Sequence, residues 1–365
     1  MNTEIKELVD MIKMLTTELE QLKNENVNKS NEIENLKKAV HELYDANSEL
    51  ILHLSKLIGD VTRNENAHYV TRARCDNAKF EILDPRGSMS ELFYPYIVSR
   101  KETVAKIYKE RKSIARFGDG EFSAIAKKDR HKFQKIDSRL SERLNEVLNS
   151  KHPNLLIAIA DNYGRLDKFT EHAADGIRFY MTEDARELHQ ELLDGERIYY
   201  NAYMSRPYVM YQDNDTDMPK QRFGMLKKIW ENRTVIVVEG EKTRTGVGND
   251  LLGNAKEVKR IIAPAVNSFD RYDDILKASL EQGEEDILYL IAMGPSAGIL
   301  AYDLTVKGYQ AVDIGHIDLE YEWFLAGKGV RVPIPHKYNN EYKDGDQVVD
   351  VDDPVYEAQI ICRFD

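Results

Sequence analysis

The stretch TVIVVEGEKTRTGVGNDLLGNAKEVKRIIAPAV, residues 234–266, sets the architecture of this chain. It contains two apolar runs, 234–240 and 258–266, on either side of a loop rich in glycine and charge. Unbroken apolar runs of this length are typical of strands buried on both faces of a parallel sheet. Two more follow at 286–294 (DILYLIAMG) and 310–315 (QAVDIG). We expect helical segments such as YDDILKASLEQG and AGILAYDLTVKG to separate the runs, which predicts repeated strand–helix–strand units.

The same alternation extends toward the N-terminus. The expected strands are SIARFG (113–118), LLIAIAD (155–161) and RIYYNAYM (197–204), and the expected helices cover 94–111, 136–150, 182–193 and 318–329. We therefore predict an α/β fold that is Rossmann-like, with a mostly parallel sheet, right-handed crossovers and helices on both faces. Ligands of such sheets bind at the carboxyl ends of the strands, so we expect the functional residues there.

The first 61 residues have a different pattern, a heptad repeat without proline. The a positions are Ile5, Ile12, Leu19, Asn26, Ile33, Val40, Asn47, Leu54 and Val61, and the d positions are Leu except for Lys29. This pattern predicts a parallel coiled-coil helix that forms a homodimer, with the two asparagines fixing the register. The alternative is a helix packed back on its own domain. We expect a linker over 62–89, the α/β domain over 90–345 and a Pro-rich, acidic tail over 346–365.

Composition excludes several classes of function. The 365 residues include 51 Lys and Arg against 63 Asp and Glu, a net charge of −12, whereas nucleic-acid binders need a basic surface. Two cysteines, Cys75 and Cys362, make neither a disulfide framework nor a cysteine zinc site. No apolar stretch is long enough to cross a bilayer, and the N-terminus lacks the pattern of a signal peptide. We therefore expect a cytoplasmic protein.

An acidic pair follows the first predicted strand of the domain. Asp119 and Glu121, with Gly120 between them, come directly after SIARFG. Two carboxylates at this spacing suit a hard cation such as Mg²⁺ or Mn²⁺, which completes its shell with water and substrate phosphates. The alternative is an ordinary surface turn.

The loop after residue 240 suggests phosphate binding. Gly246 and Gly248 would bring backbone N–H groups to a diphosphate at a helix start, with Asn249 or Asp250 as the helix cap. Lys242 and Arg244 would add charge. The glycine spacing G-x-G-x-x-x-x-G differs from the dinucleotide fingerprint and from the P-loop, which argues against a second hypothesis, an NAD-dependent Rossmann oxidoreductase. An ordinary tight loop remains the alternative.

Three more strand ends carry polar or small residues. Asn267 follows one strand, and the turn Gly294-Pro295-Ser296 follows the next. His316 comes directly after QAVDIG, with Asp318 close behind it. Histidine at a strand end suits a ligand or a proton acceptor, whereas Asp318 also fits a helix N-cap.

These segments together resemble a known family. ARFGDGEFSAI, VVEGEKTRTGVGNDLLGNAKEVKRIIAPAVNSFDRYDDIL and GPSAGILAYDLTVKGYQAVDIGHIDLEYEWF resemble the GT-D-type bacterial glycosyltransferases, over about residues 90–345. The resemblance implies a metal-dependent transferase that moves a hexose, such as glucose or galactose, from a UDP-sugar to a glycan or glycoprotein. It places the family's D-x-E metal motif on Asp119 and Glu121, and its terminal motif on His316, Asp318, Glu320 and Glu322.

The resemblance and the strand-end pattern give a set of expected roles. We assign donor binding to Arg116, Gly118, Lys242, Arg244, Gly246, Gly248, Asn249, Asn267, Gly294, Pro295 and Ser296. The acceptor hydroxyl must lose a proton to a carboxylate or histidine. The candidates for this base are Asp250, His316, Asp318 and Glu241, of which Asp250 and His316 rank first. A third hypothesis is a non-enzymatic scaffold, in which the coil assembles partners and the α/β unit binds a ligand.

Overall fold

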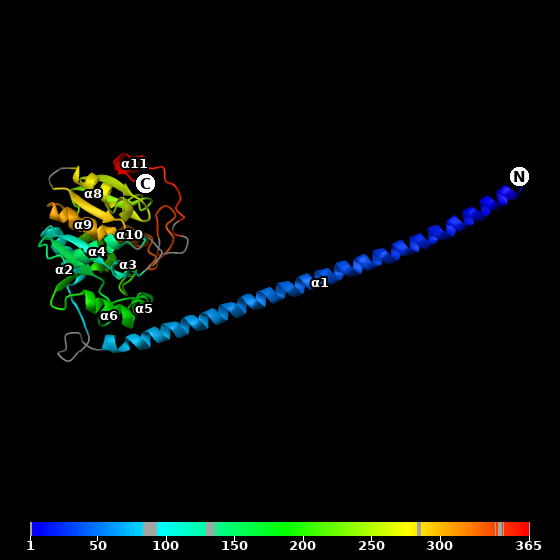
Figure 1. The fold of residues 1–365 in the computed structure, drawn as a ribbon, viewed down its shortest axis with the longest axis horizontal. Coiled ribbons are helices and arrows are strands. Elements are labelled where there is room, and N and C mark those ends of the chain that lie inside the picture. The colour runs from blue at the N-terminus through cyan, green and yellow to red at the C-terminus, as the bar shows by residue number, and fades with distance from the viewer. Residues whose placement is uncertain are drawn as a thin grey trace. The chain divides into compact units, whose positions relative to one another are not determined.

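The computed structural model describes residues 2–82, 93–128, 134–135, 137–282, 286–339, 341, 345 and 347–364. The chain divides into two compact units, Met1–Thr71 and Arg72–Asp365 (Figure 1). The first unit is part of one helix, and the second is an α/β unit. None of the helices in the described ranges is long and apolar enough to cross a membrane.

Helix α1 spans Asn2–Ile82. In unit 1 the apolar side chains of the predicted heptad positions from Leu8 onward are exposed, as Leu8 (61%) and Leu54 (49%) illustrate. The helix does not end near residue 61, so the prediction of a linker is wrong for residues 62–82, and residues 83–89 lie outside the described part. The reason is local: the heptad pattern ends, but neither glycine nor proline occurs between Gly59 and Pro85, so nothing stops the helix.

The last turns of α1 belong to unit 2 and pack on helices α5 (Glu171–Tyr180) and α6 (Glu183–Leu192). Asn77 is buried there, and its side chain accepts a hydrogen bond of 2.6 Å from the guanidinium of Arg186. That guanidinium also lies 3.7 Å from the ring centroid of Phe80. Arg178 forms two hydrogen bonds of 2.7 and 2.8 Å with the Glu81 carboxylate. Residues 72–82 are thus an integral part of the α/β unit.

The described residues of unit 2 contain a single nine-stranded sheet of order β1-β4-β3-β2-β8-β7-β5-β6-β9, in which every pair is parallel. The strands are β1 (Tyr96–Ile97), β2 (Ser113–Phe117), β3 (Leu155–Ile159), β4 (Ile198–Asn201), β5 (Thr234–Gly240), β6 (Glu257–Ala263), β7 (Leu288–Ala292), β8 (Gln310–Asp313) and β9 (Ile360–Arg363). All the strands expected from apolar runs are present. The predicted α/β fold is therefore confirmed.

Helices cover both faces of this sheet, and each face has its own apolar core. Helices α2 (Arg100–Lys109), α5, α7 (Met218–Lys227) and α10 (Ile317–Leu325) contribute to one core. Helices α3 (Asp119–Ile125), α4 (Ser138–Leu148), α6, α8 (Tyr272–Leu280) and α9 (Ser296–Val306) contribute to the other. Figure 1 shows these helices around the sheet.

Two expectations about the C-terminal half are wrong. The connection between β5 and β6, residues 241–256, consists of turns and contains no helix. The stretch expected to be a tail contains α11 (Pro354–Gln359) and β9. Strand β9 pairs with β6 and so belongs to the sheet. The stretch IICRF near the chain end is short and apolar, so the acidic composition of residues 346–357 concealed a strand.

The functional edge of the sheet lies where β2 and β8 meet. The chain leaves β2 into α3 and α4 on one face, and leaves β8 into α10 on the opposite face. Where adjacent strands send the chain to opposite faces, their carboxyl ends leave a crevice in which ligands of such sheets bind. The fold therefore directs attention to the residues just after β2 and β8.

The packing of residues 72–82 predicts where the chain can be shortened. Removal of residues 1–71 should leave the thermal midpoint of the α/β unit within a few degrees of the full-length value. Removal of residues 1–82 should lower the midpoint strongly, because Arg186 and Arg178 lose their partners in a partly buried site. Thermal unfolding followed by circular dichroism measures both. Equal midpoints for the two truncated chains would contradict the packing described.

Buried His189 predicts a pH dependence of stability. Tyr163 lies 2.6 Å from its Nδ1 and Tyr180 2.8 Å from its Nε2, and burial, assisted by the charge of Arg186, lowers its pKa to about 4. At pH values between about 4 and 6.5, the unfolded chain binds a proton at His189 that the folded chain does not bind. Acidification in this range therefore destabilises the fold. Stability should fall by about 2 kcal/mol between pH 7 and pH 5 from this group.

Urea unfolding at several pH values tests this contribution. The variant His189→Gln keeps a polar group between the two tyrosines but does not titrate in this range. Its stability should depend less on pH than that of the natural chain between pH 7 and pH 5. Parallel pH profiles for the two proteins would show that His189 does not titrate as described.

Candidate functional site

Arg116 and Asp313 join the two strands that flank the crevice. The Arg116 guanidinium donates to Oδ1 of Asp313 at 2.7 Å and to its backbone oxygen at 2.9 Å. Gly315, with φ of 48°, lies directly against this guanidinium, and a Cβ there would be 2.1 Å from Nη2 of Arg116. Arg116, expected to bind the donor, is thus engaged in holding β8 to β2. The glycine in DIGH is required by this contact.

The acidic pair lies in the first turn of α3. Asp119 is exposed at the tip of β2, and Glu121 is partly buried. The Glu121 carboxylate accepts a hydrogen bond of 2.8 Å from the backbone N–H of Gly118. Burial raises the pKa of Glu121 to about 6, with a smaller contribution from the charge of Asp313. Glu121 therefore caps the helix, and Asp119 is the carboxylate that faces outward.

A second acid, which the sequence analysis missed, lies at the next strand end. Asp161 follows β3 and accepts a hydrogen bond of 3.2 Å from the Asn201 side chain at the end of β4. The Tyr203 hydroxyl donates to Asn162 at 2.5 Å. Burial raises the pKa of Tyr203, and the charges of Asp119 and Asp161 both add to this increase. Asp161 directly follows the apolar run 155–160, just as Asp119 directly follows the run 113–118. This shared position could have identified Asp161 as a candidate site residue from the sequence.

His316 follows β8 and belongs to a cluster of charges. Its Nδ1 lies 2.6 Å from Oε1 of Glu341. Arg206 donates to the same carboxylate at 2.7 Å, with a second, shorter contact, and Arg331 lies 3.1 Å from it. Burial alone would raise the pKa of Glu341. The nearby charges of Arg206 and His316 have the larger effect and hold this pKa well below its usual range. The sequence analysis identified only His316, because the other three residues follow no motif.

Glu320 fixes the loop that carries Arg206. Its buried carboxylate accepts hydrogen bonds from the backbone N–H groups of Tyr208, at 2.9 Å, and Val209, at 3.1 Å. It also lies 3.8 Å from the guanidinium of Arg206. Burial raises the pKa of Glu320, and Arg206 opposes this increase. Glu320, in the terminal motif, therefore has a structural task and does not face a substrate.

The donor set can be tested against a divalent cation. Among the described residues, no three His, Cys, Asp or Glu side chains gather closely enough to hold a metal ion by themselves. Asp119 and Glu121 supply hard carboxylate oxygens, which is the chemistry that Mg²⁺ and Mn²⁺ prefer, and such ions commonly take one or two carboxylates plus phosphates and water. The residues thus fit a cation that arrives with a phosphorylated ligand.

The glycine loop after β5 is joined to α10 by hydrogen bonds. The Gly246 N–H donates to Oδ1 of Asp318 at 2.9 Å, and the Asn249 side chain donates to Asp318 at 3.0 Å and to Glu322 at 2.7 Å. Lys337, fully buried, lies 2.5 Å from Asp318 and 2.8 Å from Glu322. No helix begins after Gly248, so the expected helix cap at Asn249 or Asp250 is wrong. This network joins the loop to α10.

Two residues of that loop hold the segment after α10, Arg244 through its side chain and Lys242 through its backbone. Arg244 is buried and donates to the backbone oxygens of His336 and Val349, both at 2.8 Å. The backbone oxygen of Lys242 accepts a hydrogen bond of 2.9 Å from the N–H of Tyr338. In Figure 1 this segment is part of the orange and red chain between α10 and α11. Arg244 therefore anchors the segment.

The remaining candidate bases differ in surroundings. Asp250 accepts hydrogen bonds from Lys227 at 2.8 Å and from the Tyr321 hydroxyl at 2.7 Å, and these two contacts lower its pKa. A carboxylate with a lowered pKa is a poor proton acceptor. Glu241 is exposed after β5, and Asp318 is buried against Lys337. His316 is the one of the four that lies between β8 and the charged cluster.

The ends of β6 and β7 are joined to each other. The Ser296 and Ser268 hydroxyls lie 2.7 Å apart, and both donate to the backbone oxygen of Met293. Asn267, in the left-handed region, accepts a hydrogen bond of 2.9 Å from the N–H of Lys135. Pro295 precedes α9, and Gly294 has a positive φ with open space where a Cβ would lie. The open space at Gly294 leaves room for a ligand to approach the backbone of this turn.

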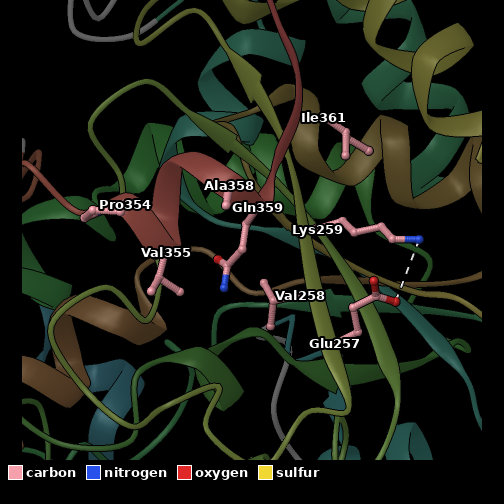
Figure 2. Close-up of a pocket in the computed structure, with 8 residues that line it drawn as sticks. All are labelled: Glu257, Val258, Lys259, Pro354, Val355, Ala358, Gln359 and Ile361. Carbon is pink, nitrogen blue, oxygen red and sulfur yellow. Dashed lines mark ion pairs between the residues drawn. The ribbon is translucent and has the colours of Figure 1, made fainter.

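A cavity of about 470 Å³ lies elsewhere. It lies between the first residues of β6 and α11, and Figure 2 shows Val258, Val355 and Gln359 among its lining side chains. These residues occupy the amino-terminal end of β6, opposite to the edge that carries Asp119 and His316. The cavity is therefore separate from the candidate site.

Comparison with known proteins identifies the family of this chain. Residues 114–342 match the family described as "Glycosyltransferase GT-D fold". The chain is 34% identical over 264 residues to Glycosyltransferase GlyD of Streptococcus pneumoniae, and 32% identical over 274 residues to the probable glycosyl transferase Gly of Streptococcus gordonii. These matches cover 72% and 73% of this chain but only 32% and 39% of the relatives, so the chain spans about a third of their length.

Solved structures show the same similarity. One described as a new glycosyltransferase from Streptococcus sanguinis has a TM-score of 0.69 and 31% identity, over 74% of this chain and all of that one. Another, described as a highly conserved domain with a distinct glycosyltransferase fold, has a TM-score of 0.68 at the same identity, over 74% of this chain and 95% of its own. The chain belongs to the GT-D family of glycosyltransferases.

Proposed function

We propose that the protein transfers a hexose from a UDP-sugar to a glycan or glycoprotein acceptor, in a reaction that depends on Mn²⁺ or Mg²⁺. The observation that supports this most directly is the set of polar side chains at the carboxyl ends of β2, β3, β4 and β8. Asp119, Asp161, Tyr203, Arg206 and His316 come from four strand ends and lie at the same edge of the sheet. This is where a sheet of this topology binds a nucleotide.

Asp119 and Glu121 would hold the cation, together with the phosphates of the donor. The cation supplies a Lewis acid that stabilises the negative charge of the departing diphosphate. Glu121 keeps its hydrogen bond to Gly118 and so fixes the turn that presents Asp119. Asp161, which pairs with Lys168, adds a third carboxylate close to the same strand ends, which suits the hydroxyl groups of a sugar.

His316 is the residue that fits the role of the base. The acceptor oxygen forms a bond to the anomeric carbon while the bond from that carbon to the diphosphate breaks, and the acceptor proton passes to the histidine. Asp250 is paired with Lys227 and Tyr321, and Asp318 with Lys337, so neither carboxylate is available to take a proton. Glu241 has no place in the cluster at β8.

The coil adds an assembly step to this proposal. Unit 1 exposes an apolar heptad face along its length, and such a face is stable in water only when a partner helix covers it. We propose a parallel homodimer. Its function would be to bring two catalytic units to one acceptor.

The metal assignment predicts the effect of changing Asp119. Asp119→Asn should lower kcat/KM for transfer from a labelled UDP-sugar in the presence of Mn²⁺ by about 10²–10³-fold, since one preorganised electrostatic contact contributes about that much. Asp286→Asn is the matched control, because Asp286 lies at the amino-terminal end of β7 and pairs with Arg111 on the surface. Equal activity of the two variants, or transfer that persists in chelator, would refute the assignment.

The coil predicts a difference between two leucines that are both exposed. Leu50 occupies a d position, whereas Leu52 occupies an outward f position of the same heptad. Leu50→Glu should shift the mass measured by light scattering toward the monomer at micromolar concentration, because it places charge in the seam. Leu52→Glu should leave the dimer unchanged. A dimer that withstands Leu50→Glu and removal of residues 1–71 would show that the coil is not the contact.

A further inference from the structure

We infer that Glu341 is a positioning residue for His316: its carboxylate receives the Nδ1–H of the imidazole and leaves Nε2 as the proton acceptor of the transfer reaction. This inference deepens the proposed function and rests on it. The direct observation is that Nδ1 of His316 is buried, lies 2.6 Å from Oε1 of Glu341 and has no aligned hydrogen-bond partner among the described residues, so the carboxylate is the group placed to receive its N–H. Glu341 lies 25 residues beyond His316 in sequence, in the segment after α10, and follows no motif.

Glu341 is held in place from several directions. Arg206 approaches both oxygens of its carboxylate, and Nε of Arg331 lies 3.1 Å from Oε2. The N–H of Glu341 donates to the side chain of buried Asn339 at 3.0 Å. A carboxylate fixed by two arginines and by its own backbone can hold an imidazole in one orientation. The buried Lys337 anchors the segment four residues earlier.

The two arginines also decide which group carries the proton. Since Arg206 and Arg331 stabilise the ionised carboxylate, Glu341 remains an acceptor and does not take the proton from His316. An ionised carboxylate at Nδ1 fixes the tautomer with a free lone pair on Nε2, and stabilises the imidazolium that forms when Nε2 takes the acceptor's proton. The proton thus stays on Nε2 until solvent removes it.

The charged groups around His316 come from every element packed against it. Arg206 lies at the end of the short helix after β4, Glu320 is on α10, and Arg331 and Glu341 belong to the following segment. Arg116 lies below, against Gly315, and is neutralised by Asp313. The three arginines and the three carboxylates of this cluster balance in formal charge. Removal of either sign should therefore shift the pKa of His316 in a definite direction.

The contrasting explanation is that Glu341 is only a latch, which fastens the segment after α10 to Arg206. A latch would affect stability and perhaps substrate affinity, and would leave the protonation of His316 unchanged. The two explanations differ in one measurable quantity, the pKa of His316.

The experiment is a pH titration of the full-length protein labelled with ¹³C at histidine Cε1, with the His316 signal assigned by its loss in His316→Gln. Glu341→Gln preserves shape but removes the charge that stabilises the imidazolium, and should move the titration of the His316 signal to lower pH. Arg331→Gln removes a cation that neutralises Glu341, and should raise the pKa of His316. General destabilisation cannot produce opposite shifts in two variants of one cluster.

Activity provides the second readout and separates the two proposals. In Glu341→Gln the acidic limb of the kcat/KM profile should move to lower pH with the pKa, and kcat should fall at least tenfold on the plateau, because the base is weaker and less well oriented. Glu341→Asp, a shorter carboxylate, should restore part of kcat. Glu357→Gln, in a surface pair with Arg363, is the matched control and should change neither quantity.

Two results would overturn the inference. One is an unchanged pKa of His316 in Glu341→Gln, with activity reduced equally at all pH values, which is the behaviour of a latch. The other is a shift of the same sign in Glu341→Gln and Arg331→Gln. If instead the opposite pKa shifts appear but His316→Gln keeps full transfer activity, the contact is real and the choice of His316 as base in the proposed function is wrong.

Discussion

The structure depends on how β8 is held beside β2, because backbone pairing contributes little there. The registered ladder between the two strands has a single pair, Ile114 with Val312, whereas β5 and β6 are paired over seven residues. Side chains replace the missing ladder: Arg116 binds Asp313, and the Ser113 hydroxyl accepts the N–H of Ala311 at 2.9 Å. A buried ion pair that carries several hydrogen bonds fixes geometry even where its net contribution to stability is modest. This junction separates the face of α3 from the face of α10, and so places Asp119 and His316 on either side of one crevice.

The acids of the terminal motif, Asp318, Glu320 and Glu322, hold the fold together, and this follows from their partners. Asp318 and Glu322 share Lys337 and Asn249, and Glu320 receives two backbone N–H groups. A buried carboxylate is stable only when such partners replace water, so each of these contacts also prevents the acid from acting on a substrate. The contacts bring three distant segments, the loop after β5, α10 and the chain near Lys337, to one place. The acids of this motif therefore position the segments around the candidate site.

The sequence predicted the sheet well and the site only in part, for physical reasons. Apolar runs such as 234–240 and 155–159 predict buried strands because nothing but a packed core tolerates them, and all appear where expected. The end of α1 was predicted too early because a heptad pattern indicates only where a partner helix packs. The helix itself continues beyond that pattern, to Ile82. Strand β9 was missed because its four residues lie beside an acidic stretch. Arg206, Arg331 and Glu341 could not be predicted, since no local pattern records that three separate segments meet at His316.

The charges around His316 explain how an imidazole and an ionised carboxylate can lie so close together. A carboxylate beside a histidine increases basicity only while it stays ionised, and at a half-buried position it would otherwise tend to protonate. Arg206 and Arg331 remove that tendency from Glu341, and Glu320 in turn keeps Arg206 in position through Tyr208 and Val209. The cluster thus links three parts of the chain. Glu320 on α10 positions the loop after β4, Arg206 in that loop holds Glu341, and Glu341 lies in the segment after α10. Because the chain must complete that segment before the cluster can form, the reactivity of His316 is coupled to the folding of the C-terminal part of the domain.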